Sequence, residues 1–374
     1  MYDQIREDTL CAMLYAAVVM LSLIACCYLL FRRGNAFAPE ITPPARLRRW
    51  TAMFFAILVV DHVWYMPIFF LTSSEDIMMI DLIGGLLDSM TVFPLMIVVL
   101  LAMLQDRRRP LWPVTVMFAP IVVGNAFNFT TRSYDFLPIV YIYSLLVFTC
   151  LIIYMVRSLR RYGRWLRDNF ADLEHKEVWQ SFVVLAIMLL VFFVYALINE
   201  NQIYTYVMLA VSAVLICFLL WRVETISDLS ILQLQNLYVV ELAAAEAEDM
   251  KDNGPSQTNH DNIGSLLQQH CIDTQLYLQH DLNISQLAKT IGINRLYLTK
   301  YFSSQGTNYN AYINDLRIQH FVTLYHEAVA SHRSFSAQQL AQESGFYTYR
   351  TFSDAFKRKI GYTVSAWIKA QNEA

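Results

Sequence analysis

The sequence has few charged residues for its length. Only 16% of its 374 residues are Asp, Glu, Lys or Arg, whereas 56% are hydrophobic. Its six cysteines are scattered without a C-x-x-C pair or a Cys/His metal spacing, so neither a disulfide framework nor a zinc site is indicated. P-loop, H-E-x-x-H, G-x-S-x-G and G-x-G-x-x-G motifs are also absent. We therefore expect no enzyme activity, no cofactor and no metal.

Long apolar runs fill the chain up to Trp221. A helix that spans a membrane needs about 20 mainly apolar residues. Seven runs meet or approach this length, so the sequence predicts a bundle of seven spanning helices. These runs are Leu10–Phe31, Trp50–Leu71, Ile77–Leu104, Leu111–Phe129, Phe136–Val156, Val178–Ile198 and Gln202–Trp221.

Basic residues near the ends of these runs predict the orientation of the bundle. Arginine-rich loops occur at 32–49, 107–109 and 157–176, and Arg222 follows the last run. With seven spans, all of these clusters fall on one side of the membrane. Because positive loops stay in the cytoplasm, we expect the N-terminus outside and the C-terminal region inside.

A few polar side chains lie at membrane depth. Asp61, His62, Asp88 and Asn125 all fall within predicted spans. Ionisable groups are costly in a bilayer, so they are a hypothesis for a site that senses a ligand or a proton. The alternative is that they only form hydrogen bonds between helices.

Residues 223–263 connect the membrane region to the rest of the chain. The first part lacks glycine and proline and is rich in alanine, leucine and glutamate, which favours a helix that continues from the last span. Its spacing fits either the seam of a parallel dimeric coiled coil or one amphipathic helix. The residues at heptad spacing are Val223, Ile226, Ser230, Gln233, Leu237, Val240, Ala244 and Ala247. Lys251–Ile263 is polar and contains Gly-Pro, as a flexible linker does.

Two helix-turn-helix patterns occupy residues 264–374. In Leu340–Gly361 a short helix breaks at Gly345 and resumes with Phe352 and Phe356 on one face. Ile284–Phe302 repeats this layout, with a turn at Gly292. The second helix of such a unit can enter the major groove of DNA.

About one hundred residues, Leu276–Lys369, resemble the AraC-type bacterial transcription regulators. The matching residues are Leu287-Ala288, Leu298, Phe302, Tyr312–Arg317, Leu340-Ala341, Gly345-Phe346, Phe352, Ala355–Lys357 and Gly361. The resemblance implies that two recognition helices of one chain enter successive major grooves. Asp354 departs from the family pattern, where a basic residue is usual.

The resemblance also implies which side chains face DNA. In the first unit these are Leu296, Thr299 and Lys300, and the helical pattern adds Arg295. In the second unit they are Tyr349, Arg350, Thr351 and Ser353, and Lys357 lies beside them. Arginine can pair bidentately with guanine, and hydroxyl groups can bond bases or phosphates. Ten basic against seven acidic residues from Gly264 onward is a modest excess for a DNA-binding region.

The sequence thus predicts an all-α protein with three parts. Residues 1–222 would form the seven-span domain, 223–263 the connector and 264–374 the DNA-binding domain. Such a chain would sit in the bacterial inner membrane, sense an unidentified signal and bind promoter DNA. Expected partners are the lipid bilayer, double-stranded DNA, a second copy held through the connector helix, and RNA polymerase. Two rivals stay open: a membrane transporter with a regulatory tail, and an interaction protein whose tail reads no DNA.

Overall fold

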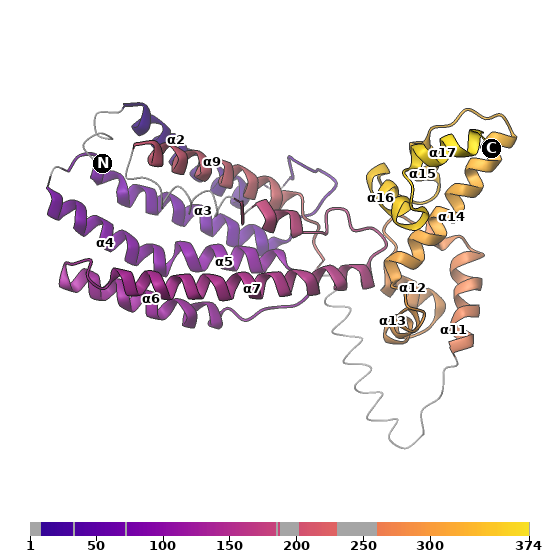
Figure 1. The fold of residues 1–374 in the computed structure, drawn as a ribbon, viewed down its shortest axis with the longest axis horizontal. Coiled ribbons are helices and arrows are strands. Elements are labelled where there is room, and N and C mark those ends of the chain that lie inside the picture. Colours follow the sequence, from indigo (N-terminus) through magenta and orange to yellow (C-terminus); the bar gives the residue numbers. More distant parts are fainter. Residues whose placement is uncertain are drawn as a thin grey trace, which may run out of the picture. The chain divides into compact units, whose positions relative to one another are not determined.

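The computed structural model describes residues 9–32, 34–71, 73–184, 186–187, 202–229 and 260–373. Within these ranges the predicted all-α class is confirmed, because every regular element is a helix apart from an isolated bridge between Phe170 and Asn283. The chain forms two compact units, whose elements are drawn in Figure 1. The membrane unit comprises Met1–Arg160 and Val178–Ser230, and the tail unit comprises Arg161–Glu177 and Ile231–Ala374.

Six helical stretches of the described chain are long and apolar enough to cross a membrane. They correspond to six of the seven predicted spans. The other one, Val178–Ile198, lies largely outside the described residues. The helices of this unit are α2 (Thr9–Phe31), α3 (Ala45–Tyr65), α4 (Ser74–Met90), α5 (Val92–Met103), α6 (Trp112–Thr131), α7 (Leu137–Asn169) and α9 (Gln202–Glu224), with α4 and α5 in one stretch.

The third predicted span is divided rather than continuous. It was expected as one helix over Ile77–Leu104, but α4 ends at Met90 and α5 begins at Val92. Thr91 between them leaves the helical region, with φ −125° and ψ −67°. The physical cause is Pro94, because its ring clashes with the carbonyl group four residues earlier, at Met90.

Helix α7 extends well beyond the predicted span, which was expected to end at Val156. Its apolar part leaves many large side chains exposed, among them Ile142, Leu145, Leu146 and Ile152, each at least 60% exposed. In a soluble protein such a surface would be unstable in water, whereas in a bilayer it faces lipid. The last turns, with their arginines, belong to the tail unit.

The sequence predicts one helix that runs from the last span into the connector. This prediction is wrong for the first residues of the connector. Helix α9 ends at Glu224, and residues 226–229 are not helical. The backbone there is held by the membrane unit, since the Gln105 side chain donates to the Ser227 carbonyl (2.9 Å) and accepts from Leu229 N (2.8 Å). Val223 and Ile226 are fully buried and form no exposed seam. The remaining heptad positions, from Ser230 onward, lie outside the described residues.

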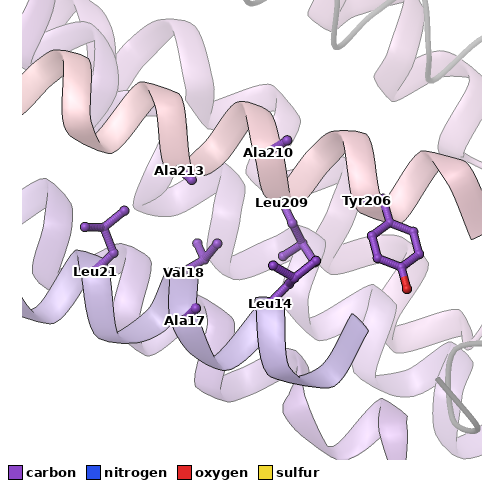
Figure 2. Close-up of a pocket in the computed structure, with 8 residues that line it drawn as sticks. All are labelled: Leu14, Ala17, Val18, Leu21, Tyr206, Leu209, Ala210 and Ala213. Atoms are coloured by element: carbon purple, nitrogen blue, oxygen red, sulfur yellow. The ribbon is translucent and has the colours of Figure 1, made fainter. Parts of the chain in front are cut away.

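An apolar cavity of about 180 Å³ lies between α2 and α9 (Figure 2). Alanines on both helices leave this space, while leucine side chains and Tyr206 border it. The Tyr206 hydroxyl is the one polar group that its lining side chains carry. The lining residues are Leu14, Ala17, Val18, Leu21, Tyr206, Leu209, Ala210 and Ala213.

The tail unit contains two hydrophobic cores joined by one long helix. The first core gathers around Leu287, Leu298 and Phe302, and the second around Phe321, Phe352 and Phe356. Helix α14 (Tyr309–Ala330) contributes to both cores. The other helices are α11 (His260–Leu267), α12 (Ile284–Ile291), α13 (Arg295–Ser304), α15 (Ala337–Glu343), α16 (Tyr349–Ile360) and α17 (Val364–Glu373), with short turns η3 (Gln268–Ile272) and η4 (Leu276–Leu278).

Candidate DNA-binding surface

The first helix-turn-helix unit consists of α12 and α13, and its boundaries follow from local chemistry. A capping box joins Asn283 and Gln286, with both hydrogen bonds at 3.0 Å. Gly292 ends α12 in the left-handed region, at φ 72°. Asn294 then caps α13 by accepting from Leu296 N at 2.8 Å. These bonds fix where the first recognition helix, α13, begins.

The second unit consists of α15 and α16. Ser336 caps α15 by accepting from Gln339 N (3.1 Å), and Thr348 caps α16 by accepting from Thr351 N (3.4 Å). Gly345 makes the turn at φ 92°, and Gly361 ends α16 at φ 87°. Helix α16, the second recognition helix, therefore begins and ends at local signals, as in the first unit.

Four of the nine predicted DNA-facing side chains are exposed: Leu296, Lys300, Arg350 and Lys357. The last two stand on α16, whose last turn also carries the exposed cations Arg358 and Lys359. Lys359 forms an ion pair with Asp315 on α14. The exposed cations give each recognition helix a positive group that can reach a phosphate or a base edge.

The other five predicted residues are only half-exposed: Arg295, Thr299, Tyr349, Thr351 and Ser353. Tyr349 packs on the second core with its ring 5.7 Å from that of Phe352, which is a structural role. The Thr299 hydroxyl donates to the Arg295 carbonyl of its own helix at 3.1 Å. The outward positions predicted from the helical period are therefore not equally available to DNA.

Two of the half-exposed residues interact with a segment that sequence reasoning did not connect to DNA binding. The Thr351 hydroxyl donates to the Glu174 carboxylate at 3.4 Å. Burial lowers the pKa of the Arg295 guanidinium, and the nearby negative charge of Asp168 raises it. Both acidic residues belong to the part of the tail unit that precedes Val178. No local sequence signal indicates these pairs, because each joins residues more than 120 positions apart.

The polar residues predicted at membrane depth separate into two places. Asp61 and Asp88 lie close to each other, and His62 Nδ1 lies 3.8 Å from the Asp61 carboxylate. Tyr65 packs against Gly84 and donates to Asp88 at 3.2 Å. Asn125 instead donates to the Gly85 carbonyl at 3.1 Å and ties α6 to α4.

Comparison with known proteins bears on one part of the chain. Residues 287–370 match a family model described as a helix-turn-helix domain. No curated protein and no solved structure matches the chain. The matched residues run from the middle of α12 into α17, so they include both recognition helices. The C-terminal region of this chain is a helix-turn-helix domain of the AraC type.

Proposed function

We propose that this protein is a membrane-tethered, one-component transcription regulator that binds promoter DNA through both recognition helices. The observation that carries this proposal is the pairing of two complete helix-turn-helix units on one helix, α14, each with an exposed cation on its second helix. Two such helices on one rigid domain can read successive major grooves. The apolar helices of the membrane unit would hold this domain at the cytoplasmic face of the bacterial inner membrane.

Individual side chains would have different roles in DNA recognition. Arg350 stands in the first turn of α16, where recognition helices meet base edges, and would pair with guanine. Lys300 and Lys357 would contact phosphates and fix the position of the domain on the duplex. The small positive excess of the tail supports weak binding by one copy, so we propose that a second copy and RNA polymerase strengthen occupancy at promoters.

Genome-wide occupancy of the full-length protein tests this function. We expect discrete peaks for the native protein, and their loss when Arg350→Ala and Lys300→Ala are combined. One bidentate base contact contributes about 1–3 kcal/mol of discrimination, and a lost phosphate contact weakens binding to all sequences. Arg333→Ala is the matched control, because Arg333 is exposed on the same domain but pairs with Glu343. Equal peaks in all three strains would contradict sequence-specific reading by α13 and α16.

We further propose that the Asp61–Asp88 pair senses the signal, by gaining or losing a proton or by binding a polar ligand. The pair is partly buried together with Tyr65 and His62, and a change of charge there must disturb the packing of α3 against α4. Asp88→Asn should lock the regulatory output in one state while protein levels stay normal. Expression of the regulated genes across growth conditions is the measurement, with Asn125→Ala as a control for lost interhelical bonding. A response that survives Asp88→Asn would exclude the pair as the sensor.

A further inference from the structure

The segment 161–177, called here the docking segment, lies between two predicted membrane spans yet belongs to the tail unit. It comprises the last turns of α7 and the loop that follows. Phe170, Ala171 and Asp172 are buried in this unit, and Ala171 is part of the first hydrophobic core. The helix-turn-helix domain is therefore built around a piece of the loop between membrane helices.

Backbone and amide hydrogen bonds hold the docking segment in place. Phe170 forms an antiparallel bridge with Asn283, the residue that caps α12. The buried Asn310 side chain donates to the carbonyl groups of Phe170 (3.1 Å) and Ala171 (2.6 Å). Asn314, one turn further along α14, donates to Ala171 as well (3.3 Å). These four polar interactions hold the Phe170–Ala171 dipeptide in a defined position on the helix-turn-helix domain.

The same segment places a carboxylate on the second recognition helix. Glu174 accepts from the hydroxyl of Thr348 at 2.5 Å and from that of Thr351 at 3.4 Å. Thr348 is the cap of α16, so the carboxylate lies at the helix N-terminus, where the helix dipole and the first-turn donors attract an anion. In a DNA complex, a phosphate binds to donors of this kind.

A second carboxylate of the segment acts on the first recognition helix. Asp168 lies close enough to Arg295, the first residue of α13, for its charge to affect the guanidinium. Arg295 is half-buried in this arrangement, although its position predicts contact with DNA. The segment thus places a carboxylate at the N-terminal end of α16, and the charge of Asp168 reaches the first residue of α13.

We propose that Glu174 of the docking segment is an autoinhibitory mimic of a DNA phosphate, and that it competes with DNA for the N-terminal end of α16. The proposal rests on the function proposed above. If only the form with Glu174 undocked binds DNA, the apparent dissociation constant equals the intrinsic value divided by the undocked fraction. Because α7 begins in the membrane unit and ends in the docking segment, rearrangement of the membrane helices has a covalent path to this contact.

The test measures DNA binding by the full-length protein in lipid nanodiscs at low salt. The probe is a fluorescent mixed-sequence duplex that spans two successive major grooves, and its anisotropy reports binding. We expect Glu174→Gln to bind about tenfold more tightly than the native protein, the equivalent of one charge-assisted hydrogen bond. Glu327→Gln removes the same charge from an exposed site on α14 and should change affinity by no more than about twofold.

Hydrogen exchange in the native protein provides a second readout that a general charge effect would not change. Ala171 N donates to the Leu282 carbonyl, which lies outside the docking segment. Adding the duplex should speed exchange of the Ala171 amide. Equal affinities for Glu174→Gln and Glu327→Gln, or unchanged exchange on binding, would overturn the competition and leave the proposed function standing. Absence of DNA binding by every form would overturn both.

Discussion

Gly345→Ala should destabilise the second helix-turn-helix unit by about 3–5 kcal/mol, the largest effect that we expect from one added methyl group in the tail. Gly345 has φ 92°, a conformation that residues with a Cβ rarely adopt. Its Cβ would lie 2.8 Å from Leu278 Cα and 2.9 Å from Leu278 O. Because both atoms belong to the backbone of η4, no side-chain rotation can relieve the clash.

Gly361→Ala is the matched control for this change. Gly361 also has a positive φ, 87°, but nothing lies within 4 Å of its added Cβ. Only the backbone strain remains there, at about 1 kcal/mol. Hydrogen exchange of the Phe352 and Phe356 amides in the full-length protein measures the free energy of opening of this core. Equal losses of protection in the two variants would show that the approach of η4 to the turn does not matter.

The second large effect is expected at Arg317, whose side chain is only 1% exposed. Its guanidinium donates to the carbonyl groups of Tyr277 and Gln279, each at 2.7 Å. It also lies 5.6 Å from the centre of the Phe346 ring, in the second core. Arg317 therefore connects η4, α14 and both cores through one side chain.

Arg317→Met should cost about 2–4 kcal/mol, because a similar volume remains but two carbonyl groups lose their donor. Replacing a buried ion pair with apolar side chains can leave stability unchanged when both charged partners are removed. Here the acceptors are backbone carbonyl groups, which remain buried after the substitution. Arg333→Met removes the pair with Glu343, whose side chain is 35% exposed, and should cost less than about 1 kcal/mol. Protection of the Leu298 and Phe352 amides distinguishes the two variants. A small effect at Arg317 would mean that water replaces the lost donors.

The helix-turn-helix units could be predicted in detail because their signals are local. The capping box at Asn283, the glycine turns and the inward positions of Leu298, Phe352 and Phe356 depend on residues within one or two turns of each other. Apolar length was likewise enough to find the described spans. The break in the helix after Met90 also has a local cause, Pro94. A search for long apolar runs does not detect this break, because proline does not interrupt the apolar run.

The sequence by itself determined the class of the protein: apolar helices that can span a membrane, and a tail with two helix-turn-helix units. Tertiary structure decided which outward residues of the recognition helices are available. Lys300 and Arg350 remain exposed, whereas Arg295 is half-buried and Thr351 donates to Glu174. The physical reason is that helical period reports only which face of a helix is polar. What covers that face depends on hydrogen bonds between residues far apart in the chain, such as Glu174 and Thr348, and these have no counterpart in local sequence.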